Sequence, residues 1–324
     1  MKKFAQRVCS LLVAGSLSLS AMAADYTLKI SHSAQPGEPY HLGLQTFVER
    51  LQTLTDGRVD AILYPNSQLG NEKAVTEGLL LGTVDIAVSA NGVLYNFEPS
   101  VGIFDLPYLF PDRARFHAAL DGPVGEQLKE KVAARGFHIL AYYDAGIRHL
   151  LTKRPVNAIG DLAGMKIRTI QVPAHIAAWK AFGANPTPMN YDELYGALET
   201  GVVDGAEAAN SNYYAQKFYE VAPNYAQVAW TALVAELLIS EKRLKSFPED
   251  IQQAILQAAQ ESAEVERKAY AEADVALLAK LQEAGVNVTY PDLAPFREAA
   301  RGIQAAFAKT PEQRAQLELL TGDH

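Results

Sequence analysis

The sequence has little cysteine and little positive charge. Cys9 is its single cysteine among 324 residues, which excludes an intramolecular disulfide and a zinc site built from several thiolates. Lys and Arg number 29 against 37 Asp and Glu, so the formal charge is −8 and the pI is near 5.4. This balance argues against a nucleic-acid-binding protein, because phosphate backbones are bound by clustered basic side chains. The hydrophobic share of 49% nevertheless predicts a folded chain, and its length allows two domains.

The first residues have the pattern of a secretion signal. They carry three basic residues, Lys2, Lys3 and Arg7. An apolar stretch over residues 8–19 follows, and the small-x-small pattern that ends at Ala23 predicts cleavage there. The alternative, a membrane anchor, is less favoured because the stretch is shorter than the ~20 residues that span a bilayer. Removal of a signal peptide over residues 1–23 would leave 301 residues without cysteine and with a formal charge of −11. We therefore expect a protein exported to the periplasm.

The hydrophobic pattern predicts an α/β fold. Its first part alternates strands and helices, with a strand over 26–30, a helix over 41–54, a strand over 59–63, a helix over 72–80 and a strand over 85–88. The alternation returns later, with strands over 166–170, 187–189 and 203–206 and helices over 174–182 and 191–199. Such alternation favours parallel, doubly wound sheets. Two such units in one chain predict two lobes.

A long helix is predicted near the C-terminus. Residues 248–285 contain no internal proline or glycine, with Pro248 suited to the start of the helix and Gly285 to its end. The predicted apolar stripe consists of Ile251, Ile255, Ala258, Val265, Leu277, Leu278 and Leu281. We expect this face to pack against the core.

Motifs for catalysis or metal binding are absent from the sequence. It contains no Gly-x-Ser-x-Gly elbow, no Gly-x-x-x-x-Gly-Lys phosphate loop and no His-Glu-x-x-His pair. The seven histidines are scattered, and none lies four residues from another. We therefore predict no catalytic residues, no metal site and no cofactor. A Ser/His/Asp triad stays open, because its three residues meet in the fold and have no fixed spacing in the sequence.

Two arginines stand in unusual places. Arg168 lies within the predicted strand over 166–170, and Arg148 lies between Gly146-Ile147 and the apolar residues that follow it. Arginine is rarely buried without a partner. Either each pairs with an internal carboxylate, or both face a cleft and bind an anionic ligand through the two parallel hydrogen bonds that a guanidinium offers a carboxylate.

Seven stretches carry a resemblance to a known family. They are Thr-Asp-Gly-Arg-Val (55–59), Tyr-Pro-Asn-Ser-Gln-Leu-Gly (64–70), Gly-Thr-Val-Asp (82–85), Phe-Asp-Leu-Pro-Tyr-Leu-Phe (104–110), Leu-Ala-Gly-Met-Lys-Ile-Arg (162–168), Gly-Ala-Asn-Pro-Thr-Pro-Met (183–189) and Leu-Glu-Thr-Gly-Val-Val-Asp-Gly (198–205). In content and order they resemble the solute-binding proteins of tripartite ATP-independent periplasmic (TRAP) transporters, the DctP family.

The resemblance implies a two-lobed periplasmic solute-binding fold, in which each lobe is a sheet flanked by helices and a long helix packs along both. We expect one lobe to comprise residues 24–146 and 235–275, and the other to comprise residues 147–234 and 276–324. The chain would be a monomer that captures a small organic acid, a dicarboxylate or sugar acid, and delivers it to TRAP-type membrane permease subunits, with no nucleic-acid partner.

The resemblance also implies which residues bind the acid. Arg168 matches the arginine that pairs with the ligand carboxylate in this family, and Arg148 matches a second basic residue of the same pocket. The other candidates follow predicted strands or the 183–189 turn, where ligands bind in α/β folds. They are Ser31, His32, Glu72, Asn91 and Tyr191.

One departure from the family concerns the segment after Gly205. The family usually has a Glu-Asn pair there, whose Asn helps to hold the carboxylate, but here Ala208 follows Glu207. Arg168 would then act with Asn210 or Asn212, or the pocket would have extra room. Glu207 would either contact the ligand or serve as the counter-ion of the arginines. Two other functions stay open: a periplasmic enzyme acting on a small carboxylic acid, and a ligand receptor for a sensor protein.

Overall fold

The computed structural model describes residues 24–322, so the predicted signal peptide lies outside the described residues. Within this part, nine strands form one sheet in the order β2-β1-β3-β8-β4-β7-β5-β6, with β9 beside β8. The strands are β1 (Tyr26–Ser31), β2 (Val59–Tyr64), β3 (Ile86–Ala90), β4 (Phe137–Thr152), β5 (Lys166–Thr169), β6 (Asn185–Pro188), β7 (Gly205–Ala208), β8 (Asn224–Ser240) and β9 (Asn287–Thr289).

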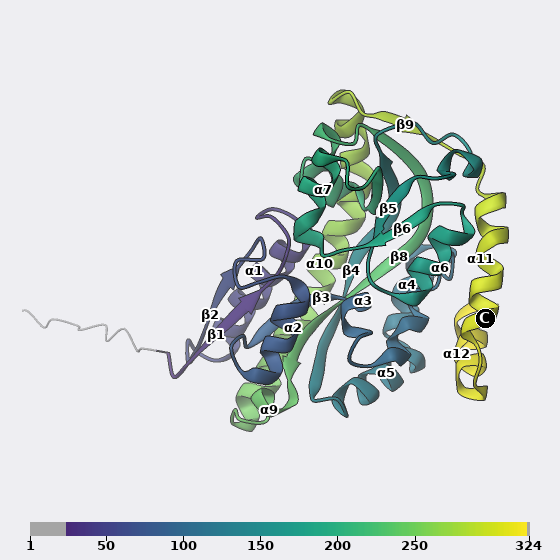
Figure 1. Cartoon of the computed structure of the whole chain (residues 1–324). Coiled ribbons are helices and arrows are strands. Elements are labelled where there is room, and N and C mark those ends of the chain that lie inside the picture. Colours follow the sequence, from purple (N-terminus) through teal and green to yellow (C-terminus); the bar gives the residue numbers. More distant parts are fainter. Residues whose placement is uncertain (1–23, 323–324) are drawn as a thin grey trace, which may run out of the picture.

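Helices flank the sheet along its length (Figure 1). The α-helices are α1 (Pro39–Leu54), α2 (Glu72–Leu81), α3 (Asn91–Leu94), α4 (Arg113–Leu120), α5 (Pro123–Ala133), α6 (Pro173–Ala181), α7 (Leu194–Thr200), α8 (Asn210–Ala215), α9 (Glu241–Leu244), α10 (Glu249–Glu283), α11 (Ala294–Phe307) and α12 (Pro311–Thr321). The 3-10 turns are η1 (Pro99–Ile103), η2 (Ile159–Leu162), η3 (Tyr191–Glu193) and η4 (Phe218–Glu220). No helix within residues 24–322 has both the length and the apolar character that crossing a bilayer requires.

Two long antiparallel strands hold the sheet together. β4 and β8 pair from Phe137 opposite Ser240 to Thr152 opposite Asn224. The parallel strands β1, β2 and β3 join through the C-terminal part of β8, whereas β5, β6 and β7 join through the C-terminal part of β4. The two groups therefore lie toward opposite ends of the long strands (Figure 1). We refer to them, with their helices, as the β1–β3 end and the β5–β7 end.

This arrangement confirms the predicted fold class. Each end has the parallel β-α-β alternation that the hydrophobic pattern predicts, and the two ends share one continuous sheet because β4 and β8 run through both. Element boundaries differ in places from the prediction. The segment predicted as one helix over 191–199 is the turn η3 followed by α7, and the strand predicted over 203–206 is β7, which begins at Gly205. Val203 was predicted to begin this strand, but it lies in the connection between α7 and β7.

β4 is irregular at the point where it passes from one end to the other. Its register with β8 shifts between Asp144 and Ile147. Gly146 has φ of 84° there, and a Cβ atom on it would lie 2.4 Å from the Cβ of Ala209. Only glycine fits this position without strain. The bulge places Arg148, two residues further on, at the start of the β5–β7 end.

Helix α10 confirms the predicted long helix. Its 35 residues follow Pro248 and end two residues before Gly285. At 1.5 Å per residue it is about 50 Å long, and it packs against α1, β4 and α8. The predicted stripe is buried at Ile251, Ile255, Ala258 and Leu281, but Val265 is exposed. The neighbouring residue, Glu266, is buried instead of Val265. Its carboxylate accepts a hydrogen bond from the main-chain N–H of Asp144, at 2.9 Å.

Candidate ligand-binding site

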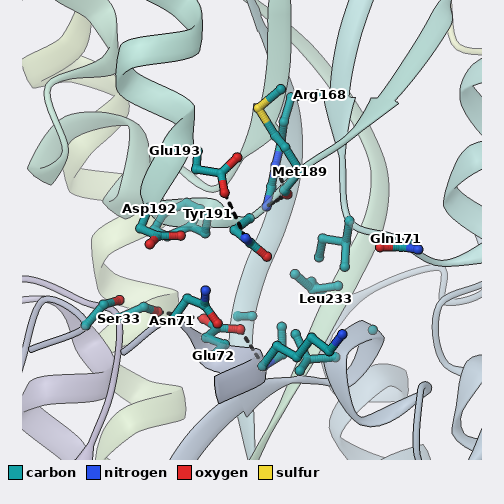
Figure 2. A pocket seen from close by; sticks show the side chains of 18 of the residues that line it. Ser33, Asn71, Glu72, Arg168, Gln171, Met189, Tyr191, Asp192, Glu193 and Leu233 are labelled. Atoms are coloured by element: carbon teal, nitrogen blue, oxygen red, sulfur yellow. Dashed lines mark hydrogen bonds between the residues drawn. The ribbon is translucent and has the colours of Figure 1, made fainter. Parts of the chain in front are cut away.

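A cavity of about 350 Å³ lies between the two ends. Figure 2 shows Arg168, Met189 and Tyr191 on one side of it and Ser33, Asn71 and Glu72 on the other. Its lining mixes charged, polar and apolar side chains with main chain and comprises Ser33, Ala34, Tyr40, Ser67, Asn71, Glu72, Lys73, Ala90, Gly92, Val93, Asn96, Ala145, Arg148, Arg168, Ile170, Gln171, Pro188, Met189, Asn190, Tyr191, Asp192, Glu193, Asn212 and Leu233. A volume of this size suits a small molecule.

The carboxyl ends of the parallel strands supply much of the lining. Ser33 follows β1, Ala90 ends β3, Ile170 follows β5 and Met189 follows β6. Open α/β sheets bind ligands at these ends because the loops that follow the strands converge there. The cavity therefore lies where the topology places a ligand site.

Arg168 presents one free edge of its guanidinium. The residue is 3% exposed, and both Nε and Nη2 donate to the main-chain oxygen of Met189, at 3.1 and 2.9 Å. These two bonds use the edge of the guanidinium formed by Nε and Nη2. Both N–H groups of Nη1 and the second N–H group of Nη2 remain available to a ligand. Among the described residues, the carboxylate that faces Nη1 is that of Glu207, with Oε1 at 3.9 Å. Arg168 therefore keeps the fork of donors that binds a carboxylate with two parallel hydrogen bonds.

The second arginine is already paired. Arg148 is 4% exposed, and its Nε donates to the Glu207 carboxylate. Its Nη1 donates to the oxygens of Ala145 and Asn212, at 3.0 and 2.9 Å, and its Nη2 donates to the main-chain oxygen of Glu207, at 3.2 Å. Burial by itself lowers the pKa of Arg148, but the Glu207 carboxylate more than offsets this and raises it. Arg148 thus lines the cavity as half of a buried ion pair.

Glu207 lies between the two arginines. It is fully buried on β7 and bonds Arg148 with one oxygen, while its other oxygen faces Arg168. Burial lowers the pKa of Arg168, and Arg148 acts in the same direction, whereas Glu207 raises it. Glu207 is absent from the cavity lining. Of its two predicted roles, the geometry therefore favours the counter-ion.

Tyr191 contributes an aromatic face beside Arg168. The Arg168 guanidinium lies 5.8 Å from the centre of the Tyr191 ring, a distance at which cation–π attraction operates. The Tyr191 hydroxyl is buried and has no hydrogen-bond partner among the described residues. Burial raises the pKa of Tyr191 well above its ordinary value, so the hydroxyl stays protonated. It is a free donor at the wall of the cavity.

Glu72 lies across the cavity at the N-terminus of α2. Its Oε1 accepts from the Ser33 hydroxyl at 2.6 Å, and its Oε2 accepts from the main-chain N–H of Ala90 at 3.1 Å (Figure 2). Asn71 caps the same helix, and its side chain accepts from the main-chain N–H of Ala74. The carboxylate is therefore held in place at a helix terminus that favours negative charge, with acceptor capacity left for a hydroxyl group.

Asn212 and Asn210, the two amides predicted to act with Arg168, have different partners. The Oδ1 of Asn212 accepts from Arg148, and its Nδ2 donates to Glu38 at 2.8 Å. Asn210 instead donates to the main-chain oxygen of Asp274, at 2.7 Å. Neither amide bonds Arg168, whose partner is the main-chain oxygen of Met189. Asn212 therefore lines the cavity as a partner of Arg148.

Several predicted residues lie outside the cavity lining. His32 faces His41, with 3.2 Å between Nε2 and Nδ1. The Asn91 amide donates to Asp105 Oδ2 at 2.7 Å. Ser31 ends β1, His32 follows it and Asn91 follows β3, as predicted, but all three residues are buried away from the cavity lining. The five predicted residues absent from the lining are Ser31, His32, Asn91, Glu207 and Asn210.

Sequence reasoning missed other residues. Those that line the cavity include Ser33, Asn71, Lys73, Gln171, Met189, Asp192 and Glu193. Most lie one to three residues beyond a predicted strand end or beside a predicted residue, so a wider search at those ends would have found them. Glu38 was missed because it lies in a loop, and its partner Asn212 is 174 residues away. Within residues 24–322, no group of three or more potential ligands could hold a metal ion.

Comparisons with known proteins found a matching family model and similar sequences. The chain matches the DctP family model, described as bacterial extracellular solute-binding protein, family 7, over residues 30–310. It is 34% identical over 315 residues to the 2,3-diketo-L-gulonate-binding periplasmic protein YiaO of Escherichia coli, covering 95% of each chain. It is 32% identical to the C4-dicarboxylate-binding periplasmic protein DctP of Rhodobacter capsulatus, covering 84% of this chain and 82% of that one.

Solved structures of TRAP periplasmic solute-binding proteins are similar as well. One from Xanthobacter autotrophicus with bound β-D-galacturonate has a TM-score of 0.88 at 31% identity and covers 92% of this chain and 100% of its own. One from Sulfurospirillum deleyianum with bound succinate has a TM-score of 0.88 at 36% identity and covers 93% and 99%.

Proposed function

Because this chain belongs to family 7 of the bacterial extracellular solute-binding proteins, we propose that its cavity captures a small organic acid through Arg168. The family and its neighbours are ligand-binding transport proteins. The observation that carries the proposal is the free edge of the Arg168 guanidinium at a cavity of ligand size. Met189 fixes the orientation of that edge, and burial strengthens its hydrogen bonds because little water competes for them.

The acid that the site fits best is a hydroxylated one. Opposite Arg168, the lining carries Glu72, Asn71 and Ser33, which accept or donate hydrogen bonds to hydroxyl groups. A second carboxylate placed beside Glu72 would be repelled by it. Relatives are named for binding 2,3-diketo-L-gulonate and C4-dicarboxylates, and solved neighbours hold galacturonate or succinate. Within this range, the polar residues around Glu72 favour a sugar acid.

The family also supports a proposal for the partners and the cellular location of this chain. We propose that the chain is exported to the periplasm after cleavage behind Ala23 and delivers its ligand, as a monomer, to TRAP-type membrane permease subunits. Relatives with periplasmic names support this location. We also propose that the lobes are residues 24–146 with 235–275 and residues 147–234 with 276–324. The bulge between Asp144 and Ile147 supports the first crossing point.

A thermal-shift screen against a library of organic acids tests the proposal. A ligand that binds only the folded protein raises its melting temperature, so sugar acids are expected to raise it and the matching neutral sugars are not. Mass spectrometry of the recovered ligand then separates a receptor from an enzyme, since a receptor returns the acid unchanged. A panel in which no acid shifts the melting temperature would contradict the proposal.

A further inference from the structure

Glu38 is a buried carboxylate at the junction of the two ends. It precedes α1 at the β1–β3 end and is 4% exposed. It accepts from the main-chain N–H of Gln35 at 2.6 Å, from Asn212 Nδ2 at 2.8 Å and from Gln216 Nε2 at 3.3 Å. Asn212 belongs to α8 at the β5–β7 end, and Gln216 follows it. Residues from both ends of the molecule therefore bury Glu38.

A chain of contacts links Glu38 to the ligand site. Asn212 bonds Glu38 with its amide nitrogen and Arg148 with its amide oxygen. Arg148 is paired with Glu207, whose second oxygen faces Arg168. The two buried arginines are thus matched by two buried carboxylates. Of the other charged residues that line the cavity, Lys73, Asp192 and Glu193 are exposed and Glu72 is half-buried, so water screens their charges more than those of the buried group.

An acid bound to Arg168 would bring a third carboxylate into this buried group. A buried charge without an opposite charge is costly, and a carboxyl group can avoid the cost by taking up a proton. Glu207 bonds the charged group of Arg148 directly. Glu38 accepts hydrogen bonds only from neutral donors, and Asn212 lies between it and Arg148. Glu38 is therefore the carboxylate best placed to be neutralised.

We propose that Glu38 takes up a proton when the cleft closes on an organic acid, so that capture of one carboxylate is linked to one proton. The inference rests on the proposed function. The proton comes from solvent and forms an O–H bond on the Glu38 carboxylate, and no other bond breaks. Gln216 can accept this new hydroxyl by turning its amide over, since its bonds to Glu38 and Gln35 are long, at 3.3 and 3.5 Å.

The electrostatics of the site support this proposal. Burial raises the pKa of Glu38 to about 7, although hydrogen bonds from Gln35, Asn212 and Gln216 and the charge of Arg148 oppose the rise. The other ionisable groups that act on it are Tyr191 from η3 and Tyr270 from α10. Both remain neutral, because burial raises the pKa of each tyrosine well above its ordinary value.

The sign of the pH dependence follows from linkage. An exposed glutamate has a pKa near 4.5, so closing the cleft over Glu38 raises its pKa. The closed form then binds more protons than the open form between these values, and affinity for the acid rises as pH falls. With one linked proton we expect binding to be about 10-fold or more tighter at pH 5.5 than at pH 7.5.

Calorimetry in buffers that differ in ionisation enthalpy tests the inference. D-galacturonate, D-glucuronate and succinate serve as probes, and the dependence of the heat on the buffer counts the protons exchanged. We expect the wild type to take up a fraction of one proton per acid at pH 7, and Glu38→Gln to take up none. Because glutamine mimics the protonated carboxyl group, Glu38→Gln should bind at pH 7.5 at least as tightly as the wild type. A purely structural role of Glu38 would instead predict weaker binding.

Glu98→Gln is the matched control. Glu98 is also a buried glutamate, 8% exposed, but its partners Ser100 and Arg135 belong to the same end of the molecule. This variant should keep the proton uptake of the wild type. Wild-type heats that do not depend on the buffer would overturn the inference while leaving the proposed function standing. Absence of binding by all three acids would contradict both. The wild-type measurement decides the question even if a variant fails to fold.

Discussion

Arg168 donates two hydrogen bonds to the main-chain oxygen of Met189, at 3.1 and 2.9 Å. This relationship has two consequences for binding. It satisfies the inner edge of a guanidinium that is almost fully buried, and it turns the outer edge to the cavity. Because Met189 follows β6 and Arg168 lies on β5, two neighbouring parallel strands fix the orientation of the group.

Arg168→Ala should weaken acid binding by about 2–5 kcal/mol, since truncation leaves the ligand carboxylate without its partner in a buried site. Arg168→Lys should recover only part of this, because an ammonium group cannot form the two parallel bonds. Isothermal calorimetry measures both variants. Arg267→Ala is the control, because this arginine bonds Asp121 and Tyr142 outside the cavity. Near-wild-type affinity of Arg168→Ala would contradict the assignment.

Glu207→Gln should destabilise the fold. The substitution leaves Arg148 buried without its counter-ion, and breaking a buried pair typically costs about 3–5 kcal/mol. Urea unfolding measures the loss. The exposed pair between Arg50 and Glu261 provides the comparison, since Glu261→Gln should change stability by less than about 1 kcal/mol. Equal effects of the two substitutions would contradict the ion-pair account.

Asn212 and Asn210 should respond differently to truncation. Asn212→Ala removes the partner of both Arg148 and Glu38 and should weaken acid binding by about 10-fold. Asn210→Ala removes a bond to the main chain of Asp274 and should lower the melting temperature with affinity retained. Calorimetry and thermal unfolding of the two variants decide the matter, and the reverse pattern would be inconsistent with the site described.

Two histidines with lowered pKa values should make stability fall in acid. Burial lowers the pKa of His32 and of His149 to about 3. Between pH 6.5 and 3 the unfolded chain therefore binds more protons than the folded chain, so stability is complete above pH 6.5 and declines below it. Urea unfolding at pH 4.5 and 7 should show a smaller decline for His149→Asn than for the wild type. His138→Asn, at a half-buried histidine that bonds Glu241, is the control; an unchanged decline in His149→Asn would contradict the assignment.

Much of the fold was predictable because it rests on local patterns. Strand and helix periodicity indicated both α/β units, and the absence of proline and glycine over 249–284 indicated α10. Val265 was misassigned because periodicity treats a glutamate as a solvent-facing residue. Glu266 is buried through a hydrogen bond to Asp144, 122 residues away, and no local pattern reveals such a contact.

The site was predictable only in part. A charged residue in an apolar strand indicated Arg148 and Arg168, and both line the cavity. The oxygen of Met189 could not be foreseen, because a main-chain acceptor has no side-chain signature. His32 and Asn91 follow strand ends as ligand residues do, yet His41 and Asp105 engage them inside the β1–β3 end. Such choices depend on partners that only the assembled fold brings together.

The most direct test of the central claim is a calorimetric titration with an acid and its neutral ester. The acid that raises the melting temperature most in the library screen would be compared with its methyl ester, which keeps the shape and removes the charge. If Arg168 captures a carboxylate, the ester should bind at least about 30-fold more weakly than the acid. This factor corresponds to about 2 kcal/mol, the least that we expect from the loss of a buried charged hydrogen bond. Equal affinity for acid and ester would contradict the account.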